Sequence, residues 1–307
     1  MSTMTPAPVT TSAASGGSGD LESHGAIPRS RRTARKTRSA AMKAVLVVLL
    51  LGFTLFPAFW MLSSAFDKSA GAGGQTLLPR EWTLANFEYV LTEGGFDVFL
   101  RNSAIVALVT VLASAVLALL ASVAVARFRF RFRTGMLLMI LVVQMVPLEA
   151  LVIPLFVQVR DLGLLNTLLG LMVVYVALSL PFGIWMLRGF VAAVPIELEE
   201  AAYIDGASWG RMFRSVLLPL VMPGLVATSV FSFITAWNEF IFAMTLLGGA
   251  SENYTVAIGL KQFFGEHTNE WGYIMAASTI ITIPVMIFFV IVQRRLSSGL
   301  VAGAVKG

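Results

Sequence analysis

Long runs of apolar residues without charge recur along the chain. Because the hydrocarbon core of a bilayer is roughly 30 Å thick, a helix needs about 20 apolar residues to cross it. Six runs reach this length, and two of them carry a single acid, Glu149 and Glu239. The predicted spans are residues 44–66, 103–126, 134–159, 162–187, 215–248 and 273–293. The pattern therefore predicts an all-α integral membrane protein with six transmembrane helices.

Positive charges are distributed unevenly between the two sides that six spans define. Segments on the side of the termini hold 17 Lys and Arg residues, against five on the other side. Since cytoplasmic segments are enriched in Lys and Arg, both termini are predicted to be cytoplasmic. The first 43 residues hold seven basic and two acidic residues, which accounts for the whole net charge of +5. The charge therefore indicates topology, and no nucleic-acid partner is expected.

Composition supports the same class. Of the 307 residues, 57% are hydrophobic and 13% are charged, whereas soluble domains have about 45–50% apolar and 25% charged residues. Residues 1–28 are mainly Ser, Thr, Gly, Pro and Ala, and a disordered basic cytoplasmic tail is predicted for residues 1–43. No repeat is visible, so residues 44–297 are predicted to form one transmembrane domain, followed by a cytoplasmic tail at 298–307.

Enzyme motifs are absent or lack their context. The chain has no cysteine, and its two histidines, His24 and His267, lie in the predicted tail and an outer loop. Residues 206–210 match Gly-x-Ser-x-Gly formally, but their flanks are predicted to be helical and no histidine is near. None of the five lysines follows a glycine, so a Walker motif is missing. We expect no catalytic residue, no metal and no cofactor in this chain.

Residues 195–219, between the fourth and fifth predicted spans, have the pattern of a helix, a turn and a second helix. Pro195 suits a helix start, and the glutamates after it place negative charge at the positive end of the helix dipole. Gly206 predicts the turn, because glycine tolerates the left-handed conformation. The helical pattern resumes at residues 212–216. The small residues of this segment are Ala201, Ala202, Gly206 and Ala207.

This segment resembles the EAA loop of ABC-importer permeases, the coupling helix that docks on a cytoplasmic ATPase. The matching residues are Glu200, Ala201, Ala202, Asp205, Gly206, Ala207, Phe213, Pro219 and Pro223. Other segments are similar to carbohydrate permeases of the maltose-transporter kind: residues 100–103, 124–130, 153–156, 162–167, 237–240 and 303–307. The long tail and Val216, where isoleucine is frequent, depart from the family pattern.

The resemblance implies a permease subunit that imports a di- or oligosaccharide across the bacterial cytoplasmic membrane. It implies as partners a second permease subunit, two ABC ATPase subunits that hold ATP and Mg²⁺, an extracytoplasmic sugar-binding protein and membrane lipid. The binding protein is expected on outer loops 67–102 and 251–272. ATPase coupling is assigned to Glu200, Ala201, Ala202, Asp205, Gly206 and Ala207.

Polar residues within the spans are candidates for the substrate path. An acid in hydrocarbon is costly unless it faces protein or water, and sugars bind through polar groups combined with aromatic faces. The candidates are Trp237, Asn238, Glu239 and Glu149. Glu149 has an alternative role, because it could bond to backbone groups freed by Pro147 and Pro154 or pair with a partner subunit.

Two other function classes are weaker. A secondary transporter or channel would use Glu149 and Glu239 with an ion gradient, but the sequence repeats and paired broken helices typical of that class are not visible. A membrane-embedded enzyme would need a nucleophile, a base and a metal set on one side of the membrane. The sequence leaves open which sugar is carried.

Overall fold

The described part of the chain is helical, with two isolated β-bridges, Asp67 to Trp82 and Phe264 to Asn269. The computed structural model describes residues 29–70, 77–265 and 269–304, with side chains for 42–70, 77–265 and 269–293. The chain divides into two compact units, residues 1–55 and 56–307, and each is described by itself. Most of α1 (Arg29–Ala65) belongs to the first unit, and the other helices belong to the second.

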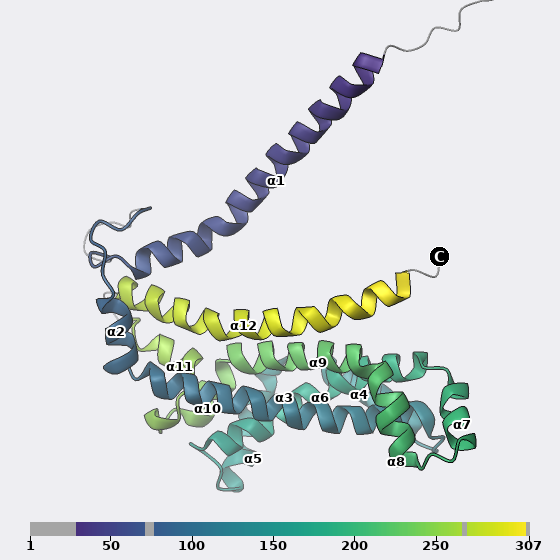
Figure 1. Cartoon of the computed structure of the whole chain (residues 1–307). Helices are drawn as coiled ribbons and strands as arrows, with labels where there is room; N and C mark the ends of the chain where they lie inside the picture. The colour runs from purple at the N-terminus through teal and green to yellow at the C-terminus, as the bar shows by residue number, and fades with distance from the viewer. Residues whose placement is uncertain (1–28, 71–76, 266–268, 305–307) are drawn as a thin grey trace, which may run out of the picture. The chain divides into compact units, whose positions relative to one another are not determined.

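The second unit contains both long and short helices (Figure 1). The remaining α-helices are α2 (Ala85–Thr92), α3 (Phe96–Arg127), α4 (Arg133–Met145), α5 (Val152–Asp161), α6 (Leu168–Ala193), α7 (Ile196–Ile204), α8 (Trp209–Met212), α9 (Leu218–Asn238), α10 (Ile241–Leu247), α11 (Val256–Lys261) and α12 (Trp271–Ala304). Two 3₁₀ segments, η1 (Leu148–Leu151) and η3 (Ser251–Asn253), and one π-helical segment, η2 (Phe213–Leu217), complete the described elements.

Within the described ranges, five helical stretches are long and apolar enough to cross a membrane. They are Met42–Ala65, Phe96–Arg127, Leu168–Ala193, Trp209–Asn238 and Trp271–Gln293. The number rises to six when the bent pair Arg133–Met145 and Leu148–Asp161 counts as one span. An all-helical membrane protein with five or six candidate spans is therefore confirmed.

The third predicted span, residues 134–159, is not one straight helix. α4 and the segment that follows it are bent by 99° at the break. Pro147 lies at this break, and proline disfavours the helical conformation in the residue before it. Val146 is accordingly extended, with φ −72° and ψ 127°. Hydropathy did not indicate the break, because Val146 and Pro147 continue the apolar run.

The fifth and fourth predicted spans also differ from the structure. The predicted span 215–248 is interrupted at Glu239, where the backbone is extended (φ −69°, ψ 128°) between α9 and α10. The predicted span 162–187 begins later, at Leu168, because Thr167 caps α6. The hydroxyl oxygen of Thr167 accepts the N–H of Gly170 at 3.1 Å, which satisfies one free donor at the helix start.

Part of the predicted disordered tail, residues 1–43, is helical. Residues 1–28 lie outside the described residues, but from Arg29 onward the backbone is α-helical and runs without a break into the first span. Residues 29–43 contain no Gly or Pro and are rich in Ala, Arg and Lys, which are strong helix formers. Lengthening an existing helix also requires no new nucleus. α12 likewise continues to Ala304, into the predicted tail 298–307.

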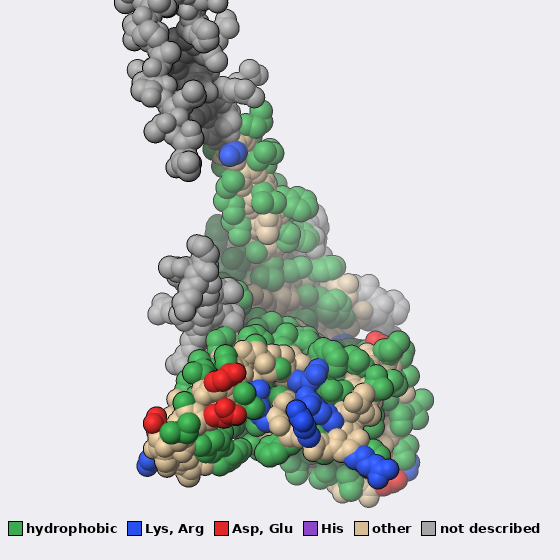
Figure 2. Space-filling view, turned by 90° about the vertical axis from the view of Figure 1, so that its right-hand side faces the viewer, with side chains coloured by type: hydrophobic (Ala, Val, Ile, Leu, Met, Phe, Trp, Pro, Cys, Tyr) green, Lys and Arg blue, Asp and Glu red, His purple; other side chains and the backbone are tan. Residues whose placement is uncertain are grey.

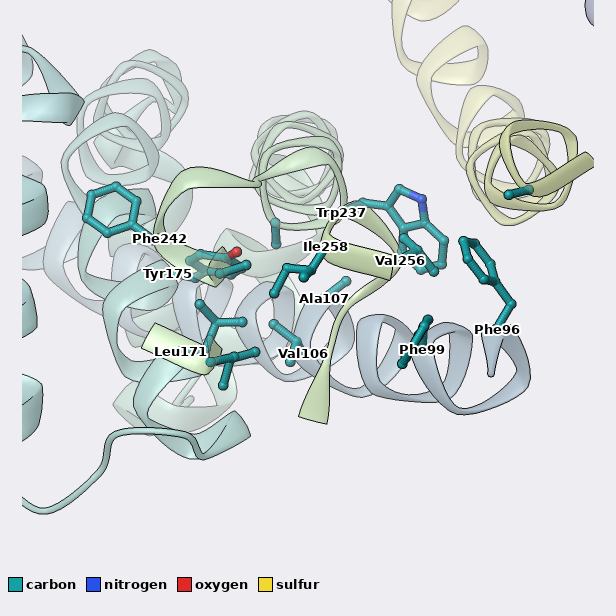
Figure 3. Close-up of a cluster of buried hydrophobic side chains, with 14 of the residues drawn as sticks. Phe96, Phe99, Val106, Ala107, Leu171, Tyr175, Trp237, Phe242, Val256 and Ile258 are labelled. Atoms are coloured by element: carbon teal, nitrogen blue, oxygen red, sulfur yellow. The ribbon is translucent and has the colours of Figure 1, made fainter. Parts of the chain in front are cut away.

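Two buried clusters hold the second unit together, and α3 contributes to both. α3 packs most extensively against α6 and then against α9. The first core cluster joins α3, α6, α9, α10 and α11 (Figure 3), with Phe96, Phe99, Val106, Leu171, Tyr175, Trp237, Phe242, Val256 and Ile258 among its members. The second core cluster consists of Ala118, Leu119, Val123, Leu187, Val191, Val194, Met212, Leu217 and Val221. In Figure 1, α7 and α8 lie at one end of this unit, and α2 lies at the opposite end.

Candidate functional site

The helix, turn and helix predicted for residues 195–219 are present as α7 and α8. α7 begins directly after Pro195, and its first turn carries Glu197 and Glu199. Carboxylates there interact favourably with the helix dipole. The second helix begins at Trp209, earlier than predicted, and continues through η2 into α9. The turn is therefore joined without interruption to a membrane span.

A widened helical turn precedes Pro219. In η2 the N–H of Leu218 donates to the C=O of Phe213, five residues back. In a regular α-helix the ring of Pro219 would clash with the carbonyl four residues earlier, and its missing N–H would leave that carbonyl unpaired. A π-type turn opens the helix at this point and relieves the conflict. The helix thus reaches α9 without breaking.

Gly206 ends α7 in a Schellman cap. Its φ is +78°, in the left-handed region. The N–H of Gly206 donates to the C=O of Tyr203 at 3.0 Å, and the N–H of Ala207 donates to the C=O of Ala202 at 2.9 Å. This pair of bonds defines the motif, which favours glycine at the left-handed position. A Cβ at Gly206 would meet no atom within 4 Å, so only the backbone requires glycine here.

The six residues predicted to couple to an ATPase divide into two groups. Ala202 and Ala207 are half-buried and pack against the second core cluster. The exposed members are Glu200, Ala201, Asp205 and Gly206. Beside them, Ile204 is 86% exposed. Figure 2 looks onto this end of the unit, where acidic and basic side chains gather in separate groups amid apolar surface. The contact of the six predicted coupling residues with an ATPase stays a prediction.

A buried ion pair beneath α7 was missed at the sequence level. The Nε of Arg127 lies 2.7 Å from Oε1 of Glu199, and the two side chains are only 14% and 8% exposed. A second guanidinium nitrogen, Nη2, donates to the C=O of Val194 at 2.9 Å. In the sequence Arg127 counted only as a topology charge and Glu199 only as a helix-dipole residue. Their separation of 72 positions gave no signal of contact.

A cavity of about 310 Å³ opens among α4, η1, α6, α9 and α10. Pockets for small molecules begin at roughly this volume, and few polar groups in an apolar lining give them specificity. The polar lining residues are Gln144, Glu149, Tyr175, Ser179, Thr235 and Glu239. The cavity therefore brings together Glu149 and Glu239, two of the four residues predicted for the substrate path.

Glu239 is held by three hydrogen bonds. Its Oε1 accepts the N–H of Phe242 at 2.9 Å. Its Oε2 accepts the N–H of Ala243 at 3.0 Å and the hydroxyl of Tyr175 at 2.6 Å. The carboxylate thus satisfies free donors at the start of α10 and connects that helix to α6. The break in the span and the acid at the break are one structural feature.

Trp237 and Asn238 do not border the cavity in the part of the chain that the structure describes. Trp237 is 2% exposed and stacks on Phe233 with 5.5 Å between ring centroids. Its indole nitrogen is buried without a hydrogen-bond partner among the described residues. Asn238 is exposed and donates to the C=O of Ile234 at 2.9 Å. The predicted path residues therefore face different surroundings.

Hydrogen bonds tie together the predicted outer loops around residues 67–102 and 251–272. The side-chain amide of Asn102 donates to the carbonyls of Glu252 and Tyr254 at 2.9 and 3.0 Å. The hydroxyl oxygen of Ser103 accepts the N–H of Val256 at 2.9 Å. Asn102 and Ser103 belong to a segment noted for its family resemblance, and the structure gives these side chains a role in holding the second loop.

Asp67 organises the start of the first outer loop. Its Oδ1 accepts the N–H and the hydroxyl of Ser69 at 3.0 and 2.8 Å. Burial alone raises the pKa of Asp67, but these bonds, with the backbone N–H groups of Arg80 and Glu81, outweigh it and lower the pKa below the ordinary value. The ionised carboxylate is therefore the form that holds this loop.

Acid should loosen the Asp67 loop. A carboxyl group whose pKa is lower in the folded state stabilises that state above its unfolded pKa of about 3.9, and the stabilisation is lost as the pH falls through the folded pKa. After correction for intrinsic exchange, hydrogen exchange of residues 77–83 should stay slow from neutral pH down to the unfolded pKa. It should accelerate as the pH falls further, through the folded pKa. Asp67→Asn should exchange faster at neutral pH. A ratio of exchange rates between wild type and Asp67→Asn that stays constant down to strong acid would contradict this prediction. Asp161→Asn is the control, because the side chain of Asp161 is 61% exposed.

The family of the chain follows from comparison with known proteins. Residues 114–301, more than half of the chain, match the family model described as "Binding-protein-dependent transport system inner membrane component". The chain therefore belongs to the inner-membrane permeases of binding-protein-dependent ABC transporters. Such transporters work with an ATPase and a binding protein. The predicted family and the location as a multi-pass protein of the cytoplasmic membrane are confirmed, and the family is one of transport subunits rather than enzymes.

Three relatives match over most of their length. The diacetylchitobiose uptake permease DasC of Streptomyces coelicolor is 42% identical over 263 residues, which cover 85% of this chain and 95% of DasC. The trehalose transport permease SugB of Mycobacterium tuberculosis and the trehalose/maltose transport permease MalG of Thermococcus litoralis are each 36% identical, with 88% of this chain and 99% of the relative covered. A chain of a bacterial ABC transporter that imports alginate has the same fold, with a TM-score of 0.72, 24% identity and coverage of 88% and 99%.

Proposed function

We propose that this chain is one membrane-spanning subunit of an ATP-driven importer of di- or oligosaccharides. The observation that carries this proposal is the near full-length similarity to DasC, SugB and MalG, whose names specify diacetylchitobiose, trehalose and trehalose or maltose. The partners are a second permease subunit, two ATPase subunits that hold ATP and Mg²⁺, an extracytoplasmic sugar-binding protein and membrane lipid. No nucleic acid takes part.

The proposed topology has both termini and the α7–α8 turn in the cytoplasm, with the binding protein on loops 67–102 and 251–272. The distribution of 17 basic residues against five supports this orientation. The turn from Glu200 to Ala207 docks on the ATPase in this proposal. The compact cap at Gly206 and the exposed Ile204 beside it fit such a contact.

Labelling tests the topology. Because the chain lacks cysteine, one introduced cysteine can be labelled selectively. In intact spheroplasts, Ile204→Cys should resist a membrane-impermeant maleimide and react only after lysis. Glu252→Cys, placed in the predicted outer loop 251–272, should react without lysis. The reverse pattern would overturn the orientation.

Reconstitution tests the function. The chain is purified with its partner permease and ATPase, placed in vesicles with the binding protein, and supplied with radiolabelled diacetylchitobiose, trehalose or maltose. We expect uptake of at least one saccharide that requires ATP on the ATPase side and the binding protein on the other. The chain alone should transport none. Uptake by the chain alone under an ion gradient, lost in Glu149→Gln, would support the secondary-transporter alternative instead.

The substrate path is proposed to include the cavity that Glu149 and Glu239 line. Carboxylates accept hydrogen bonds from sugar hydroxyls, and Tyr175 and Phe242 add aromatic surface to the same lining. Glu239 already accepts three hydrogen bonds, whereas Glu149 is exposed and makes no side-chain hydrogen bond within the described residues. Glu149 is therefore the freer of the two to contact a substrate. Trp237 and Asn238, outside this cavity, are the weaker candidates.

A further inference from the structure

Arg127 joins three elements at the end of the unit that carries α7. It is the last residue of α3, it donates to the C=O of Val194 directly after α6, and it pairs with Glu199 on α7. Its guanidinium therefore bridges the short connection between α6 and α7. A cation at the end of α3 also interacts favourably with that helix's dipole.

The other contacts of α7 with the core are small. The half-buried Ala202 on α7 and Ala207 just after it pack against the second core cluster, and each contributes only a methyl group. Apolar contacts of this kind are non-directional, so they do not by themselves define one orientation of the helix. A guanidinium that holds a carboxylate and a carbonyl in a planar fork does define one.

The helices on the far side of this junction, α3 and α6, form one packed pair. α3 and α6 share the most extensive packing of any helix pair in the described residues. Of the two, α6 lines the cavity directly, since it supplies Tyr175 and Ser179. A displacement of α7 that reached α3 and α6 together would therefore reach the cavity.

We propose that Arg127 is a positioning residue that fixes α7 to the α3–α6 pair through Glu199 and Val194, so that movement of α7 is passed to both helices. The proposal rests on the proposed function, because the ATPase is what would move α7. It assigns coupling to a buried contact in addition to the exposed EAA residues. The ion pair of Arg127 and Glu199 transmits the displacement of α7, and the small residues of the α7–α8 turn only allow the ATPase to approach closely.

Three variants separate positioning from stability. Arg127→Met leaves the buried carboxylate unpaired, and Glu199→Leu leaves the guanidinium without its acid. The double variant replaces the pair by apolar side chains, which is often neutral for folding. If the pair only stabilised the fold, the double variant would recover wild-type coupling. We expect instead normal abundance and ATP hydrolysis but a fall of about tenfold in saccharide taken up per ATP, within the 5- to 150-fold range of typical coupling energies.

Two further variants keep the test decisive. Arg127→Lys retains the charge and loses the fork, so it should accumulate normally and still be uncoupled. The control removes an exposed Arg–Asp pair, Arg160 and Asp161, whose side chains are 2.9 Å apart and 55% and 61% exposed. This control should couple as wild type does. Wild-type uptake per ATP in both the double variant and Arg127→Lys would overturn the proposal.

A distance measurement distinguishes failure of this proposal from failure of the proposed function. Cysteines at Ile204 on α7 and Leu112 on α3, both exposed, carry spin labels in the otherwise cysteine-free chain. In the assembled complex the distance distribution should be narrow and should broaden in the Arg127→Met/Glu199→Leu double variant. Absence of saccharide uptake in the wild type would reject the proposed function, whereas an unchanged distribution would reject the role of Arg127.

Discussion

Saccharide uptake should fall about 100-fold when Gly206 is replaced by proline, because an incompatible proline costs about 3 kcal/mol or more and each 1.4 kcal/mol is about a factor of ten. The φ of Gly206 is +78°, whereas proline is held near about −65°. Proline also removes the N–H that donates to Tyr203. The turn that ends α7 would therefore reorganise, and its exposed residues would lose their common arrangement.

Membrane insertion should persist in Gly206→Pro, since the change lies between α7 and α8 and outside the apolar runs. The measurements are abundance in the membrane, co-purification of the ATPase and uptake in vesicles. Normal uptake and ATPase association at normal abundance would show that the coupling assignment is wrong.

A graded series controls for misfolding of the proline variant. Asparagine tolerates the left-handed conformation, so Gly206→Asn should keep most uptake. Gly206→Ala should lose more, because the left-handed conformation costs about 1–2 kcal/mol for an ordinary residue. No atom lies within 4 Å of a Cβ at Gly206, so steric contact does not explain the loss. Gly210→Ala, where φ is not positive and the space is also open, should behave as wild type.

Glu239→Ala should lower the melting temperature more than any other change at the cavity. It removes the acceptor of three donors, the N–H groups of Phe242 and Ala243 and the hydroxyl of Tyr175. A buried donor without an acceptor costs about 1–3 kcal/mol. We expect α10 to loosen from α6, which thermal unfolding of the detergent-purified protein measures directly.

Matched changes at the same cavity show whether the effect belongs to the cap. Glu239→Gln keeps one carbonyl oxygen and should lose less stability than Glu239→Ala. Glu149→Gln should leave the melting temperature unchanged, because Glu149 is exposed and makes no side-chain hydrogen bond within the described residues. A wild-type melting temperature for Glu239→Ala would show that the three bonds do not support α10.

Much of the fold was predictable because the solvent dictates it. A bilayer requires long apolar helices, so the length of each uncharged run indicated a span. The breaks were harder to predict. Pro147 signalled a break in principle, but the apolar run continues through it. The break at Glu239 had no backbone signal in the sequence, since its carboxylate replaces the missing bonds only with Tyr175 and the start of α10 nearby.

The turn at Gly206 could be predicted from the sequence, whereas the ion pair of Arg127 and Glu199 could not. The cap of α7 uses residues adjacent in the chain, so proline, glutamates and glycine at fixed spacing predicted it. Arg127 and Glu199 are 72 positions apart. Taken alone, Arg127 indicated only the topology and Glu199 only a favourable interaction with the helix dipole.

The sequence by itself determined the class of the protein, its candidate spans, the positive bias of one side and the helix–turn–helix with its family resemblance, because each depends on local composition or spacing. Only the tertiary structure decided that Glu149 and Glu239 share a cavity, that Glu239 caps α10, and that Arg127 holds α7 to α3 and α6. Those facts depend on which helices pack against each other. Hydrophobic packing is non-directional, so residues far apart in the chain come into contact without any spacing in the sequence that would predict it.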